Sequence, residues 1–189
     1  MDKKCCPPPP VFPISPIPFF QWEILKAAWQ IAGVLWRDDF SEAAFQGAIN
    51  AVKGKYFELW AARCLSQILP FGHKVTLADS RVQRGWDLKI ANAQNVIFLQ
   101  VKATNDAAYI YESLTRYPQF RVFTTHEVAH KMRPRRFSKA LYILDSGMPN
   151  IELEAWIFNE ILGNKDFFKS LNPPKKRRKR ERRFSKILL

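Results

Sequence analysis

Side chains able to do chemistry gather near the ends of two strand-like runs of the chain. The first run, residues 84–90, carries Asp87 near its start, and the second, residues 95–104, carries Gln100 and Lys102 toward its end. Because side chains alternate along a strand, Gln100 and Lys102 should face the same way. An acid, an amide oxygen and an ammonium on neighbouring strands suit a metal-dependent site that cleaves phosphodiesters.

A second acid, Glu58, lies upstream in a helical stretch, beside the apolar face of that stretch. Hard cations such as Mg²⁺ take oxygen ligands, commonly one or two carboxylates together with waters and substrate phosphate. We expect Glu58 and Asp87 to bind Mg²⁺ or Mn²⁺, with the Gln100 amide and the Val101 backbone carbonyl as weaker ligands. Lys102 would stabilise the charge that builds on the phosphate, or help to hold an attacking hydroxide whose formation the metal promotes.

The order of these groups resembles a known family. The chain is similar to the PD-(D/E)xK nuclease superfamily in three motifs. These are G-x-x-x-E in a helix, with Glu58 as its acid, Gly-Trp-Asp at residues 85–87, and Gln-Val-Lys-Ala-Thr at residues 100–104. The likeness is nearest in style to Holliday-junction resolvases and Mrr-type enzymes with Q-x-K, although Trp86 replaces the proline before the acid. It implies a restriction-endonuclease-like fold and metal-dependent hydrolysis of DNA by Glu58, Asp87, Gln100 and Lys102. A homodimer is a further implication, since such nucleases often dimerise to cut two strands.

A rival pattern is His126-Glu127-Val128-Ala129-His130, which matches the H-E-x-x-H zinc-protease signature. In that signature the two histidines share one helix face and bind zinc, and the glutamate activates water. Only about two helical turns fit before Pro134, which is short for an active-site helix. A partly exposed helix is therefore the favoured interpretation, and a zinc metalloprotease that uses His126, Glu127 and His130 is the alternative.

Charge points toward a polyanionic partner. The net charge is +13, and residues 175–186 alone hold nine Lys or Arg against one acid. Lysines and arginines near the expected site and in this tail suit the phosphate backbone of DNA, with RNA as an alternative. The expected nucleic-acid contacts are Lys55, Arg81, Arg84, Lys89, Arg133, Arg135, Arg136, Lys175, Lys176, Arg177 and Arg178. Binding should be structure-directed or weakly sequence-specific, because no recognition helix or zinc finger is apparent.

The basic run at residues 174–180 also fits a nuclear localisation signal, and the sequence leaves targeting and DNA contact equally open. Three cysteines give no disulfide framework, which favours a reduced compartment, either the cytoplasm or the nucleoid. The chain has no apolar run long enough to span a bilayer, so we expect no membrane partner. A catalytically weak nucleic-acid-binding or interaction module on the same fold is another alternative, because Gln100 is neutral.

The elements that must position these residues follow from hydrophobic periodicity and breakers. We predict a proline-rich arm (1–18), one nuclease-like domain (19–172, with a helical extension at 19–40 and a core at 41–172) and a basic tail (173–189). The predicted helices span 21–36, 41–68 (one helix or two), 106–117, 125–132 and 152–162. The predicted strands span 73–78, 84–90, 95–104, 121–124 and 140–144. This order predicts an α/β/α sandwich with a mixed sheet.

Overall fold

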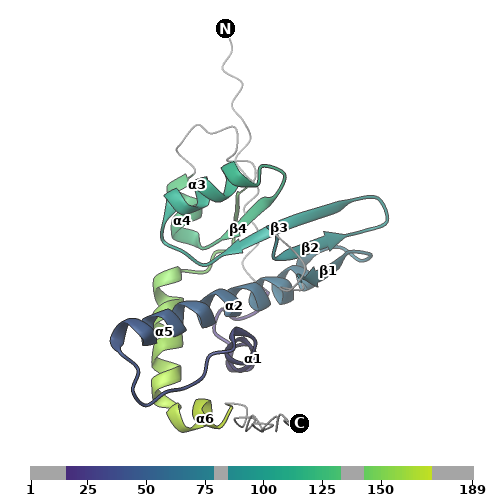
Figure 1. Ribbon diagram of the computed structural model, residues 1–189. Coiled ribbons are helices and arrows are strands. Elements are labelled where there is room, and N and C mark those ends of the chain that lie inside the picture. Colours follow the sequence, from purple (N-terminus) through teal and green to yellow (C-terminus); the bar gives the residue numbers. More distant parts are fainter. Residues whose placement is uncertain (1–15, 79–84, 133–142, 172–189) are drawn as a thin grey trace, which may run out of the picture.

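The protein is a mixed α/β structure built on a five-stranded sheet, seen in a computed structural model that describes residues 16–78, 85–132 and 143–171. The strands lie in the order β1-β2-β3-β4-β5. The first three pair antiparallel, and β3-β4 and β4-β5 pair parallel. Helices cover both faces of this sheet (Figure 1). The predicted mixed α/β class with a mixed sheet is therefore confirmed.

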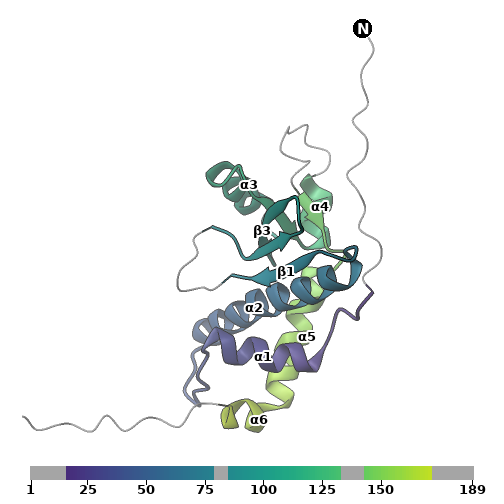
Figure 2. The ribbon, with the colours of Figure 1, turned by 90° about the vertical axis from the view of Figure 1, so that its right-hand side faces the viewer.

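A single long helix, α2 (Glu42–Ile68), runs under the sheet (Figure 2). Its start is fixed by Ser41, whose side chain accepts a hydrogen bond from the Ala44 amide at 3.2 Å, as expected of an N-cap serine. It ends at Leu69, which is extended because it precedes Pro70. The sequence left one helix or two open, and the 27 described residues form one.

The antiparallel half of the sheet is β1 (Lys74–Leu77), β2 (Leu88–Ala91) and β3 (Val96–Lys102). Leu88 pairs with Leu99, and Ala91 pairs with Val96. The Asn92 side chain closes the β2–β3 turn, since its Oδ1 accepts from the amides of Gln94 and Asn95 at 2.9 and 2.7 Å. The strands predicted at 73–78 and 95–104 are present with shorter bounds. Of the strand predicted at 84–90, residue 84 lies outside the described part of the chain, and β2 covers Leu88–Ala91.

The parallel half follows through α3 (Ala107–Arg116), β4 (Arg121–Thr124), α4 (His126–Met132) and β5 (Ile143–Asp145). Asp106 caps α3 by accepting from the Ala108 amide at 2.8 Å. The strand predicted at 121–124 is confirmed with those bounds. Of the strand predicted at 140–144, residues 140–142 lie outside the described part of the chain.

The remaining helices are α1 (Trp22–Ala32), α5 (Asn150–Gly163) and α6 (Lys165–Ser170). The predicted helix 21–36 is shorter in the structure because Gly33 adopts φ +67° and ends it. The predicted helix 152–162 is α5, and α6 was not predicted.

Two apolar cores separate on the two sheet faces. One core joins α1, α2, α5 and α6 to side chains such as Leu99, Val101 and Phe123, and the other joins α3 and α4 to Val122 and Ile143. Neighbours along β4 thus enter different cores, as strand alternation requires. The face of β3 that carries Gln100 and Lys102 is therefore opposite to the face that packs on α2.

Candidate functional site

Asp87 stands immediately before β2 and joins three segments by hydrogen bonds. Its amide donates to the Leu99 carbonyl at 2.8 Å, and its carbonyl accepts from the Ala78 amide at 2.8 Å. Its carboxylate Oδ2 accepts from the Val101 amide at 2.7 Å. The carboxylate thus pairs with a backbone amide that would otherwise lack a partner where β2 and β3 separate. This hydrogen bond fixes the position of the carboxylate. Val101 meets this site through its amide, while its side chain is buried in the core beneath.

Lys102, the last residue of β3, adds a cation at the same oxygen. Its Nζ lies 3.5 Å from Asp87 Oδ2, and both side chains are 23% exposed. Thr124 of the adjacent strand donates its hydroxyl to the Lys102 carbonyl at 2.8 Å, which restrains this strand end. The structure thus brings Asp87 and Lys102 together at the edge of solvent, where a polyanion can approach both.

Gln100 is held from the side of Gly85. Its Nε2 donates to the Gly85 carbonyl at 2.6 Å. Gly85 has φ +94°, and a Cβ there would lie 2.8 Å from the Phe120 ring, so glycine is required by conformation and by space. Oε1 of Gln100 is buried and has no hydrogen-bond partner among the described residues. A buried acceptor without a partner costs free energy, so this amide oxygen marks a place where a donor or a cation would be favoured.

Glu58 belongs to α2, which packs on the face of β3 opposite to Gln100. Its side chain is 18% exposed, and its Oε2 lies 2.7 Å from Lys55 Nζ. Burial raises the pKa of Glu58, the Lys55 ammonium opposes that rise, and the negative charge of Asp87 adds to it. The Lys102 charge also lowers the pKa of Glu58. Glu58, Asp87 and Lys102 therefore share one electrostatic environment, although no hydrogen bond in the described part of the chain joins Gln100 to either acid.

These groups fit a hard divalent cation by the chemistry of their oxygens. Two carboxylates and one buried amide oxygen are the donor types that Mg²⁺ and Mn²⁺ accept. Each carboxylate has a lysine beside it, Lys55 for Glu58 and Lys102 for Asp87. Within residues 16–78, 85–132 and 143–171, no three His, Cys, Asp or Glu side chains form a metal-ligating group. A cation held by the two acids would therefore depend on water and on substrate oxygens as well, and Gln100 lies on the face of β3 opposite to the helix that carries Glu58.

Of the expected nucleic-acid contacts, the structure describes two. Lys55 is engaged with Glu58, and Lys89 lies half-buried on β2 opposite Phe98. The other expected contacts lie outside the described residues: Arg81, Arg84, Arg133, Arg135, Arg136, Lys175, Lys176, Arg177 and Arg178. Sequence reasoning missed the pairing of Lys55 with Glu58, which the spacing of three residues on a helix could have indicated. It also missed Gly85 as the anchor of Gln100.

The H-E-x-x-H segment forms α4, and its side chains have other partners. Glu127 accepts from the amides of Asn150 and Ile151 at 2.9 and 3.4 Å, so it caps the start of α5. His126 Nδ1 lies 3.1 Å from Asp145 Oδ2, and the rings of His126 and His130 are 6.0 Å apart. This geometry gives Glu127 a helix-capping role and directs His126 to a carboxylate.

Comparison of the chain with protein-family models, curated proteins and solved structures gives no match. In the portion that the structure describes, no helix has the length and apolar character needed to cross a bilayer.

Replacing Glu58 by glutamine should stabilise the protein at neutral pH. Burial raises the pKa of Glu58 above its usual 4.5, so the folded state binds this proton more tightly than the unfolded state. Stability is then lost as pH rises from the unfolded-state pKa through the raised folded-state pKa. Glutamine cannot ionise, so the variant should gain up to about 1 kcal/mol at neutral pH, because the cost of burying the charge outweighs the opposing effect of Lys55.

Urea unfolding of both proteins across acid to neutral pH measures this difference. The gain should vanish well below pH 4.5, where both side chains are neutral. The Lys55 pair lost in the variant is partly exposed and contributes little. A stability difference that does not change with pH would contradict the assigned ionisation of Glu58.

Proposed function

We propose that the protein is a metal-dependent endonuclease that hydrolyses DNA phosphodiester bonds, with RNA as the alternative substrate. The observation that carries this proposal is the junction of β2 and β3. There, one Asp87 oxygen meets both the Val101 amide and the Lys102 ammonium. Glu58 lies in the same electrostatic environment.

The order of the elements supports the same proposal. A long helix, three antiparallel strands, a helix and a parallel strand follow one another as α2, β1, β2, β3, α3 and β4. We therefore propose a restriction-endonuclease-like fold for this sheet and its flanking helices. In that fold the acid and the Q-x-K pair would occupy the positions of Asp87, Gln100 and Lys102.

Each side chain then has a distinct task. Glu58, Asp87 and the Gln100 amide oxygen would hold Mg²⁺ or Mn²⁺, which when bound supplies a Lewis acid and a more acidic water. Lys102 lies beside Asp87, so its ammonium can stabilise negative charge on the phosphate as the bond to the leaving oxygen breaks. The Gly85 carbonyl orients Gln100 by holding its Nε2. The Val101 amide fixes the Asp87 carboxylate. The side chains of Gln100 and Asp87 would therefore not have to reorganise during the reaction.

A second candidate is a nucleic-acid-binding module that cleaves weakly. It is favoured by the neutral Gln100 and by the two lysines that already neutralise the acids. In this case DNA would bind through the same surface, but a cation would compete poorly with Lys55 and Lys102.

Incubation with supercoiled plasmid and with branched DNA, in Mg²⁺, in Mn²⁺ and in EDTA, tests the proposal. The expected result is nicked or linear product that requires the divalent ion. Tight binding of both DNAs without metal-dependent product would instead support the binding module. Cleavage that persists in EDTA would contradict the proposed chemistry.

A further inference from the structure

A cavity of about 310 Å³ lies between α2 and α5, next to the loop that follows β3. This volume is at the small end of the range for small-molecule sites, roughly 300–1,000 Å³. Its apolar lining comes from α5, and its polar lining comes from α2, from α5 and from the loop after β3. The lining residues are Gln46, Asn105, Ile151, Glu154, Ala155 and Phe158.

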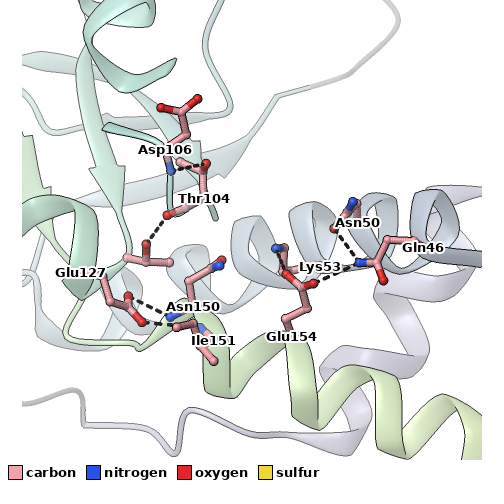
Figure 3. A network of polar contacts seen from close by, with 10 residues as sticks. Gln46, Asn50, Lys53, Thr104, Asp106, Glu127, Asn150, Ile151 and Glu154 are labelled. Carbon is pink, nitrogen blue, oxygen red and sulfur yellow. Dashed lines mark hydrogen bonds and ion pairs between the residues drawn. The ribbon is translucent and has the colours of Figure 1, made fainter. Parts of the chain in front are cut away.

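The polar lining belongs to a network of hydrogen bonds and an ion pair between α2 and α5, shown in Figure 3. Lys53 is 7% exposed and lies 2.5 Å from Glu154 Oε2. Gln46 Nε2 donates to Glu154 Oε1 at 3.0 Å and lies 3.4 Å from Asn50 Oδ1. Glu154 is thus held by two groups of α2, and its carboxylate, which accepts up to four hydrogen bonds, still has acceptor capacity toward the cavity.

A second acceptor lies between the same helices. Asn150, the first residue of α5, is 1% exposed, and its Oδ1 has no hydrogen-bond partner among the described residues. Its side chain lies in the space between α5 and α2 (Figure 3). Asn150 does not line the cavity itself, so the acceptors that a ligand meets there are the Glu154 carboxylate and the Gln46 and Asn105 amide oxygens.

The apolar wall is aromatic and partly open to solvent. Phe158 is 37% exposed and Ile151 is 65% exposed. The Phe158 ring packs edge-on against Phe45, with centroids 5.6 Å apart, so its orientation is restrained. A restrained ring in the same lining as two amides and a carboxylate offers stacking together with hydrogen bonding.

We propose that this cavity binds an unpaired nucleobase that carries an exocyclic amino group, such as cytosine or adenine. The amino group would donate to Glu154, as acidic side chains accept from cytosine N4, and the carboxamides of Gln46 and Asn105 would pair with the rest of the base edge. The base would stack on Phe158. Thymine has no amino group to donate and would bind more weakly.

Other ligand classes fit the observations less well. A free anion gains little from Lys53, because Glu154 already neutralises that charge. A basic peptide would be repelled by a chain of net charge +13, whereas a neutral base on a polyanionic strand would be attracted to it.

The cavity and the proposed cleavage site share two elements. On α2, the lining residue Gln46 precedes Glu58 by twelve residues, about 18 Å along the helix axis. Asn105 follows Lys102 by three residues in the chain. The inference rests on the proposed function only in requiring a nucleic-acid strand at this face, and a strand bound at the site could place an unpaired base in the cavity.

Anisotropy measurements in EDTA, at slightly alkaline pH where cytosine is neutral, test this inference without cleavage. Labelled oligodeoxycytidylate should bind wild-type protein several-fold more tightly than oligothymidylate of equal length. Phe158→Ala should weaken binding of the cytosine strand about tenfold by removing the stacking surface, and should bring the two strands closer in affinity. Phe167→Ala is the matched control, because Phe167 is also 37% exposed and packs on an aromatic neighbour, Trp22.

Phe158→Leu provides a second test if the alanine variant fails to fold, since leucine keeps apolar volume against Phe45 but lacks the ring face. Cytosine binding by a folded Phe158 variant within twofold of wild type would overturn the inference, as would equal wild-type affinity for the two strands. Metal-dependent cleavage together with either of those results would leave the nuclease proposal intact. A base preference that depends on Phe158, in a protein that does not cleave DNA, would contradict the nuclease proposal and support base binding in the cavity.

Discussion

Replacing Lys102 by alanine should reduce metal-dependent DNA cleavage by at least about 100-fold, the effect of losing one preorganised group that stabilises transition-state charge. Lys102 is the cation beside Asp87 Oδ2, at 3.5 Å, and it projects from the same strand face as Gln100. The folded stability should change by less than about 1 kcal/mol, because the pair is partly exposed. Single-turnover cleavage of a plasmid with saturating enzyme isolates the chemical step from binding.

Lys26→Met is a suitable control for this substitution. Lys26 is also paired with a carboxylate, Glu23, and is 29% exposed, but it lies on α1. The Lys26→Met substitution should leave DNA cleavage unchanged. Mn²⁺ binding, followed by thermal shift, should persist in the Lys102→Ala protein, because the oxygen donors remain. Cleavage by Lys102→Ala within tenfold of wild type would remove Lys102 from the mechanism.

Short-range patterns were enough to predict the elements that carry the site. The Ser41 cap, the Pro70 stop and the alternation in residues 95–102 each act over a few residues, so they are readable without knowledge of the fold. They predicted α2, β2 and β3 and the shared face of Gln100 and Lys102. The C-terminal end of α1 was predicted less well. The apolar pattern continues to Trp36, but Gly33 ends the helix.

Contacts between distant segments could not be predicted in this way. The Gly85 carbonyl holds Gln100, and only glycine fits at position 85 because Phe120 and Tyr117, from another part of the chain, leave no room for a Cβ. Glu127 was assigned to a zinc pattern as an alternative, yet its carboxylate caps a helix that begins 23 residues later. The buried Lys53 and its partner Glu154 are 101 residues apart in the chain, and their pairing was not predicted.

The Lys53–Glu154 ion pair joins α2 to α5. The side chain of Lys53 is 9% exposed, whereas that of Glu154 is 36% exposed and also accepts from Gln46. The two ends of the ion pair therefore differ in how readily water can replace the lost partner. An ammonium left without its carboxylate would stay largely out of water, while a carboxylate left without its ammonium would be hydrated.

Glu154→Gln should consequently cost about 2–3 kcal/mol of unfolding free energy, somewhat below the usual loss for breaking a fully buried ion pair. Lys53→Met should cost less than half as much, because Glu154 keeps Gln46 and gains water. The double variant, Lys53→Met with Glu154→Gln, should be more stable than Glu154→Gln alone, since no buried charge remains unpaired. Urea unfolding of the four proteins completes the double-mutant cycle. Additive effects of the two substitutions would mean that the ammonium and the carboxylate act independently, in contradiction to the 2.5 Å contact between them.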